Sequence, residues 1–168
     1  MSIPFITAEE AASHINNGDT VGFSGFTASG TPKVVSVALA NRARAFHEKG
    51  EPFKINLYTG ASTNDHVDGE LARANCIAKR TPYQSQRDAR ALANNGGMSY
   101  FDDHLSHLSQ NLRYGFYGGI DVAIIEVTEM SPNGEVILGA GIGMTPTIAQ
   151  MAKKVIIEYS SYYKTSFR

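Results

Sequence analysis

Residues 21–33 place a short apolar run, a glycine-rich loop and a helix-start signal directly one after another. The apolar run is typical of a β-strand, and Gly25 and Gly30 allow the backbone to turn sharply or to approach a ligand. Thr31-Pro32 is typical of a helix N-cap followed by the first helical residue, where free amides attract anions. The segment therefore predicts a strand, a loop and a helix around a pocket. Its spacing matches neither the dinucleotide fingerprint nor the P-loop, and a plain structural turn explains the glycines equally well.

Helical and extended patterns alternate along the 168 residues. We expect helices over residues 7–17, 32–49, 67–74 and 88–95 and after Thr145-Pro146, and strands over residues 20–24, 54–59, 76–79, 120–125, 135–138 and 155–157. The nearly continuous apolar run 120–125 predicts a central strand covered on both faces, and Asn133-Gly134 predicts a hairpin turn. The alternation predicts an α/β fold, with a mostly parallel sheet and helices on both faces. In such sheets ligands bind at the carboxyl ends of the strands.

Composition narrows the class of partner. The chain carries 15 Lys and Arg against 16 Asp and Glu, so we expect no surface for nucleic acid or for an anionic membrane. The N-terminus lacks a signal-peptide pattern and no apolar run reaches 18 residues, which favours a cytoplasmic location. The single cysteine, Cys76, excludes an internal disulfide and a cysteine-based zinc site. His104 and His107 lie at i, i+3 spacing without a third clustered ligand, so no metal site is expected.

Five segments, of which the first belongs to the glycine-rich loop, occur in the order found in one known family. They are Gly25-Phe26-Thr27-x-x-Gly30-x-Pro32-Lys33, Thr59-Gly60-Ala61-Ser62, Asp68-Gly69-Glu70-Leu71-Ala72, Tyr100-Phe101-Asp102-Asp103-His104-Leu105, and Gly143-Met144-Thr145-Pro146 leading to Ala152-Lys153-Lys154-Val155-Ile156-Ile157-Glu158. Over residues 5–158 the chain closely resembles the N-terminal half of the acetyl-CoA hydrolase/CoA-transferase family. Within that family it is most similar to the succinyl-CoA:acetate CoA-transferase group.

The resemblance implies a fold and a reaction. The family has two similar α/β domains of the class I CoA-transferase type, and this chain resembles the first of them. The family reaction moves coenzyme A from an acyl-CoA thioester to a free carboxylate through an enzyme-bound glutamyl-CoA thioester. The implied ligands are therefore acetyl-CoA or succinyl-CoA and a small carboxylate, with coenzyme A as a substrate and no covalently bound cofactor. The nucleophilic glutamate of the family lies in the second domain, so no catalytic residue is expected in this chain.

The resemblance also implies two groups of substrate-binding residues. Gly25-Phe26-Thr27 would lie against the acyl or thioester region, with backbone amides that polarise a carbonyl oxygen. Ser62 and Ser85 would donate hydroxyl hydrogen bonds to the small carboxylate. In the alternative interpretation each serine bonds its own loop backbone, as loop serines often do.

Two charged residues are weaker candidates. Glu126 follows the apolar run 120–125, so it is placed where strands end and ligands bind, although carboxylates there are commonly solvated or paired. Lys33 is expected in the first turn of a helix, where a positive charge is mildly unfavourable. It therefore either serves an anionic ligand or is a solvated side chain.

The family pattern ends at Glu158, which divides the chain into an N-terminal α/β domain, residues 1–158, and a divergent tail, residues 159–168. The second domain is expected to be missing, through natural truncation, a frameshift or deliberate shortening, and the chain alone is then an incomplete enzyme. An uncovered domain face favours self-association, so a homo-oligomer is left open. Two functions remain: the N-terminal domain of a CoA-transferase or acyl-CoA hydrolase, or a non-catalytic ligand-binding or interaction domain. A sugar-phosphate isomerase or sugar-sensing domain is a more distant alternative.

Overall fold

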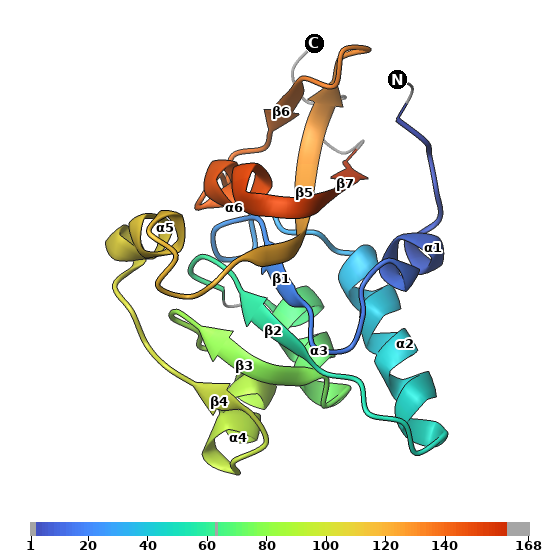
Figure 1. Cartoon of the computed structure of the whole chain (residues 1–168), viewed down its shortest axis with the longest axis vertical. Helices are drawn as coiled ribbons and strands as arrows, with labels where there is room; N and C mark the ends of the chain where they lie inside the picture. Colours follow the sequence, from blue (N-terminus) through green and yellow to red (C-terminus); the bar gives the residue numbers. More distant parts are fainter. Residues whose placement is uncertain (1–2, 63, 161–168) are drawn as a thin grey trace.

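A single sheet of seven strands runs through the molecule (Figure 1). The computed structural model describes residues 3–62 and 64–160, so most of the expected tail, residues 161–168, lies outside the described residues. The strand order is β4-β3-β2-β1-β5-β6, and β7 also pairs with β5. All pairs are parallel except β5 with β6. The strands are β1 Thr20–Phe23, β2 Ile55–Tyr58, β3 Ile77–Thr81, β4 Ser99–Tyr100, β5 Ile120–Met130, β6 Val136–Leu138 and β7 Ala152–Tyr159.

Helices cover both faces of this sheet, as the α/β prediction requires. They are α1 Ala8–Ser13, α2 Val35–Glu48, the π-helix η1 Asp65–Gly69, α3 Glu70–Arg73, α4 Arg87–Asn94, α5 Leu105–Arg113 and α6 Thr145–Met151. Along β5 the buried side chains alternate between the two cores. Val122 and Ile124 pack with α1 to α4, while Ala123 and Ile125 pack with α5 and α6. The continuous apolar run in the sequence therefore reflects burial on both sides of a central strand.

Most of the expected elements are present, with shifted ends. The hairpin expected at Asn133-Gly134 joins β5 to β6. Thr7 caps α1, since its Oγ1 accepts the Glu10 amide at 3.1 Å. The prediction that this helix continues to residue 17 is wrong, because α1 ends at Ser13 and the Gly18 amide donates to the Lys54 carbonyl at 2.7 Å.

Two elements, β4 and α5, were not expected from the sequence. Strand β4 has only two residues, both exposed, so it shows no alternation of apolar and polar side chains. Helix α5 buries Leu108 and Leu112, which are four residues apart as on one helix face. Ser109, Gln110 and Asn111 lie between these two leucines, so no continuous apolar run marks the helix in the sequence.

The start of α2 differs from its prediction in an informative way. Thr31 is not the N-cap and Lys33 is not in the first turn, because the helix begins at Val35 and its N-cap, Val34, makes no side-chain cap. The cap comes from β7 instead. The Glu158 carboxylate accepts the backbone amides of Lys33 at 2.6 Å and of Val34 and Val35 at 3.0 Å each. A carboxylate at this position also interacts favourably with the positive end of the helix dipole.

We predict that Glu158→Ala destabilises the chain by about 1–2 kcal/mol, because three amides at the start of α2 lose their acceptor. Urea unfolding followed by circular dichroism measures the loss. Glu135→Ala is the matched control, since Glu135 is an exposed glutamate of the hairpin, and it should cost less than about 0.5 kcal/mol. Equal stabilities of the two variants would mean that water replaces the Glu158 carboxylate at no cost.

Candidate functional site

The loops that follow β1, β2 and β3 meet at the carboxyl end of the sheet, as the sequence predicts. The Thr27 amide in the first loop donates to the Ala61 carbonyl in the second at 2.6 Å. The Ser62 amide in the second loop donates to the Tyr83 carbonyl in the third at 3.4 Å, and Ser62 pairs with Gln84 in a parallel bridge. The three loops therefore form one continuous edge.

Glycines let these loops approach one another backbone to backbone. Gly25 has a φ of +105°, and a Cβ on it would collide with the Thr31 side chain. A Cβ on Gly60 would lie 3.0 Å from the Gly25 carbonyl oxygen, and one on Gly143 would lie 2.5 Å from the same atom. Side chains at these positions would push the loops apart. The plain structural turn is thus part of the explanation for these glycines.

The segment Gly25-Phe26-Thr27 has already used two of its three amides. Phe26 donates to the Ser29 carbonyl at 2.9 Å, and Thr27 donates to Ala61. Among the described residues the Gly25 amide has no partner, so it is the amide left to polarise a ligand carbonyl. The Phe26 ring is half exposed beside it. The proposed contact of this segment with the acyl group stays a prediction.

Four buried polar atoms near the ends of β2 and β3 have no hydrogen-bond partner among the described residues. They are Ser62 Oγ, Asp68 Oδ2, Thr81 Oγ1 and Gln84 Oε1. Ser62 is only 3% exposed, and its hydroxyl bonds no described residue of its own loop. Asp68 pairs with Arg80, and Arg80 and Thr81 are neighbours on β3, so the Asp68 and Thr81 side chains lie on opposite faces of the sheet. A buried polar atom without a partner costs stability, so each of these atoms is a candidate for a bond to a ligand or to water.

Ser85 directly follows Gln84 in the chain but lies against α4. It lines a shallow depression of about 270 Å³ with four residues of α4, Arg87, Arg90, Ala91 and Asn94. Its carbonyl accepts the Arg90 guanidinium at 3.1 Å. The bridge partner of Ser62 is therefore Gln84 and not Ser85. No pattern in the sequence singles out Gln84, and the role of Ser85 stays a prediction.

Beneath these loops lies an ion pair that the sequence does not reveal. Arg80 Nε donates to Asp68 Oδ1 at 2.8 Å, and both side chains are 0% exposed. Asp68 belongs to one of the family-like segments, and Arg80 directly follows the expected strand 76–79, but no pattern in the sequence pairs the two residues. Its guanidinium also reaches the carbonyls of Pro82 at 3.4 Å and Tyr83 at 3.3 Å.

Glu126 is buried and paired. It is 2% exposed, and its Oε2 accepts the Lys33 ammonium, which also donates to the Thr31 carbonyl at 2.8 Å. The backbone amide of Glu126 donates to Ser24 Oγ at 3.0 Å, and that hydroxyl donates to the Gly30 carbonyl at 2.7 Å. For both charged candidates the structure therefore shows a structural partner. Glu126 Oε1 has no partner among the described residues.

The family-like segment 100–105 connects α5 to the sheet. Asp103 accepts the Tyr117 hydroxyl at 2.8 Å and the Asn111 amide at 2.9 Å, and the Tyr58 hydroxyl donates to the Tyr117 carbonyl at 2.9 Å. Burial acts to raise the pKa of Asp103, but these hydrogen bonds outweigh it and lower the pKa below its usual value. The carboxylate therefore stays ionised and holds the α5 turn in place.

Neither a metal centre nor a reactive thiol is found in the part of the chain that the structure describes. No group of three His, Cys, Asp or Glu side chains in residues 3–62 and 64–160 could hold a metal ion. His104 and His107 face each other with ring centroids 5.3 Å apart. Burial raises the pKa of the Cys76 thiol to about 12, so it stays protonated. In the same residues no helix is long and apolar enough to cross a membrane.

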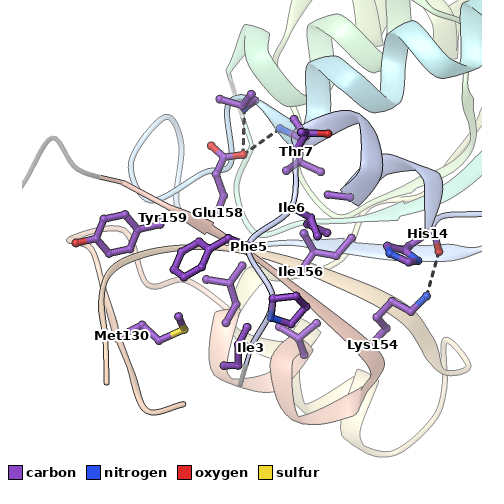
Figure 2. A pocket seen from close by; sticks show the side chains of 17 residues that line it. Ile3, Phe5, Ile6, Thr7, His14, Met130, Lys154, Ile156, Glu158 and Tyr159 are labelled. Atoms are coloured by element: carbon purple, nitrogen blue, oxygen red, sulfur yellow. Dashed lines mark hydrogen bonds between the residues drawn. The ribbon is translucent and has the colours of Figure 1, made fainter. Parts of the chain in front are cut away.

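An apolar cavity of about 440 Å³ lies away from the three loops, beside β7 (Figure 2). The N-terminal segment supplies Phe5 to it, and β7 supplies Ile156 and Tyr159. The start of α2 contributes Val34 and Val35, whose amides are held by Glu158. The cavity is thus part of the contact between the N-terminal segment, α2 and the sheet.

Comparison with known proteins identifies relatives of the chain. The acetyl-CoA hydrolase/transferase N-terminal domain matches residues 3–164. The chain is 46% identical over 158 residues to the propanoyl-CoA:succinate CoA transferase of Escherichia coli, and 44% identical over 153 residues to the succinyl-CoA:acetate CoA-transferase of Clostridium kluyveri. These alignments cover 94% and 91% of this chain but 32% and 28% of those proteins. The chain therefore spans about a third of the length of the curated relatives it matches.

Solved structures agree with this result at the level of the fold. RipA from Yersinia pestis superposes with a TM-score of 0.71 at 25% identity, over 92% of this chain and 36% of RipA. Glutaconate coenzyme A-transferase from Acidaminococcus fermentans superposes with a TM-score of 0.66 at 14% identity, over 91% of this chain and 68% of that one. The matched domain and the fold lead to one conclusion: the chain belongs to the acetyl-CoA hydrolase/transferase family and corresponds to its N-terminal domain.

Proposed function

We propose that this chain supplies the small-carboxylate side of a CoA-transferase site. In the complete reaction coenzyme A moves between an acyl-CoA, such as acetyl- or succinyl-CoA, and a small carboxylate. The observation that carries the proposal is the buried Ser62 hydroxyl without a partner, next to Gln84, whose buried Oε1 also has none among the described residues. The names of the two bacterial relatives, which pair an acyl-CoA with succinate or acetate, support the same substrate class.

The hydrogen-bonding groups of Ser62, Thr81 and Gln84 are of a kind that binds a carboxylate. Hydroxyl groups donate to carboxylate oxygens, and the Ser62 and Thr81 hydroxyls are both unpaired. Gln84 Oε1 is a hydrogen-bond acceptor. A half-turn of the side-chain amide exchanges Oε1 and Nε2, so that the Nε2 group donates at this position instead. Three neutral donors would hold the carboxylate without neutralising it, so that it remains able to attack a thioester carbonyl.

This chain is proposed to be inactive alone. Covalent transfer needs a carboxylate nucleophile that is free to attack, and the family resemblance places that glutamate in another domain. Glu126, the buried glutamate at this edge, is held by Lys33, which makes it a poor nucleophile. The remaining part of the site, including most contacts to coenzyme A, would come from a C-terminal partner domain.

Hydrolysis is the second candidate function, because the acetyl-CoA hydrolase of Yarrowia lipolytica is 38% identical to this chain over 148 residues. Transfer and hydrolysis differ in the group that attacks the enzyme-bound thioester: in transfer a carboxylate attacks and leaves as a new CoA thioester, whereas in hydrolysis water attacks and free coenzyme A is released. A dedicated carboxylate pocket favours transfer, whereas a hydrolase needs only a water. Carboxylate binding would therefore support transfer, whereas its absence together with intact folding would favour hydrolysis or a non-catalytic interaction domain.

The first prediction concerns covalent chemistry. Incubation of the chain with acetyl-CoA or succinyl-CoA, followed by intact mass spectrometry, should show no coenzyme A adduct, because the family resemblance places the nucleophilic glutamate in another domain. A full-length family member treated in the same way is the positive control. A stoichiometric adduct on any glutamate of this chain would overturn the proposal that it is inactive alone.

The second prediction concerns the carboxylate pocket. Ser62→Ala should weaken acetate or succinate binding roughly ten- to hundredfold, because a hydrogen bond to a charged group contributes about 1.5–3 kcal/mol. Titration followed by amide chemical shifts measures the affinity. Stability should stay constant or rise, since Ser62 Oγ has no partner to lose. Ser106→Ala is the control, because Ser106 is an exposed serine of α5. Equal affinities in the two variants would exclude Ser62 from the pocket.

The third prediction concerns the glycine loop. Joining a family second domain after Glu158 should restore transfer, and Gly25→Val in that fusion should lower turnover about a hundred- to a thousandfold. The valine side chain collides with Thr31 and displaces the one free amide of the segment. Gly115→Val is the matched control, because Gly115 also has a positive φ but has open space around it. Unchanged turnover would remove the loop from the mechanism, and a loss of folding would make Gly25 purely structural.

A further inference from the structure

Arg80 connects three parts of the candidate site through one guanidinium group. Its Nε donates to Asp68 Oδ1 on η1, and its two terminal nitrogens donate to the Pro82 and Tyr83 carbonyls. Pro82 and Tyr83 begin the loop that continues into Gln84, the bridge partner of Ser62. One side chain therefore holds the backbone of this loop against the helix that follows the Ser62 loop.

Stability alone does not explain this pair. Both side chains are fully buried, and removing two charges from water costs several kcal/mol per ion before their attraction is counted. Replacing such a pair by apolar residues of similar volume is often neutral or stabilising. The geometry of the fork is the feature that apolar residues cannot supply, because only a guanidinium reaches a carboxylate and two carbonyls in fixed directions.

The other half of the pair lies on an unusual element. Asp68 belongs to a π-helix, a form that is rare and is frequent at functional sites. A Cβ on the neighbouring Gly69 would clash with the Asp65 carboxylate and lie 2.8 Å from Gln86 Nε2, so this helix packs directly on the end of the loop. Gln86 Nε2 also donates to Asp65 Oδ1 at 3.1 Å. Helix η1 thus supports the loop at both of its ends.

We propose that Asp68 and Arg80 are positioning residues, whose ion pair holds loop 82–85 so that Gln84 lies beside Ser62 in the arrangement that receives the small carboxylate. The inference deepens the proposed function and rests on it. Neither residue needs to touch the ligand. Asp68 aims the guanidinium, the guanidinium fixes the two carbonyls, and the loop then presents its side chains at the edge of the sheet.

The test uses the full chain and two changes of the pair. Arg80→Met with Asp68→Leu removes both charges together, so no uncompensated ion is left buried. Arg80→Lys keeps the charge next to Asp68 but loses the fork to the carbonyls. Lys153→Met is the control, because it breaks an exposed ion pair with Asp121 at the start of β5. Each variant is measured for unfolding temperature, amide chemical shifts and acetate affinity.

We expect both pair variants to fold, to show displaced amide shifts for residues 83–85 and to bind acetate at least tenfold more weakly than the parent chain. The control should match the parent in affinity and in those shifts. A folded double variant with unchanged affinity and unchanged shifts would overturn the proposal. If the double variant does not fold, Arg80→Lys decides by the same two measurements.

A failure of the proposed function gives a different result. The parent chain would then fold but show no saturable shifts with acetate, and the pocket itself would be wrong. The amide shifts of residues 83–85 would still test the ion pair without any ligand. Unchanged shifts in both pair variants would mean that Asp68 and Arg80 do not position the loop.

Discussion

Strand β5 is hydrogen-bonded to β1 on one side and to β7 on the other, and this double pairing fixes the loop after β1 at both of its ends. The register places Glu126 of β5 beside Glu158 of β7. The Glu126 amide holds Ser24 at the start of the loop, and its carboxylate holds Lys33 at the end. Glu158 then holds the first amides of α2. The position of the glycine loop is thus set by the central sheet more than by the loop itself.

Several buried polar atoms at the same edge of the sheet have no hydrogen-bond partner among the described residues. A folded chain normally pairs its buried polar atoms, since each unpaired one costs about 1–3 kcal/mol. Here Ser62, Thr81 and Gln84 leave such atoms close to the ends of β2 and β3, and Glu126 leaves one on β5. Departures from good local bonding are expected at functional sites, where a ligand completes the set. Among the described residues, those that line the apolar cavity beside β7 contribute none of these unpaired atoms.

Local patterns were sufficient to predict most of the fold. The apolar run 120–125 identified the central strand, and the order of strands and helices identified the parallel sheet and the edge where its loops meet. The start of α2 could not be read in this way, because its cap is a carboxylate more than a hundred residues away. Thr31-Pro32 is a good local signal, but a charged acceptor on β7 outweighs it.

The candidate site was predicted less completely, for a similar reason. Ser62 was expected from the family resemblance and lies among unpaired atoms, whereas Gln84 and the pair of Asp68 and Arg80 depend on contacts between elements. Arg80 directly follows the expected strand 76–79, and its partner Asp68 is twelve residues earlier on another element. Buried charge pairs are a property of tertiary packing, so a single sequence gives no periodic signal for them.

Glu158 also couples two segments that leave the ribosome at different times. Side chains alternate along a strand, so a shift of β7 by one residue would turn this carboxylate to the opposite face of the sheet. Helix α2 can form early in synthesis, but its first amides find their acceptor only after β7 has been made and has paired with β5 in the correct register. If β7 pairs with β5 in the wrong register, the first amides of α2 have no carboxylate acceptor. The three hydrogen bonds to Glu158 therefore stabilise the correct register of β7 relative to a shifted one.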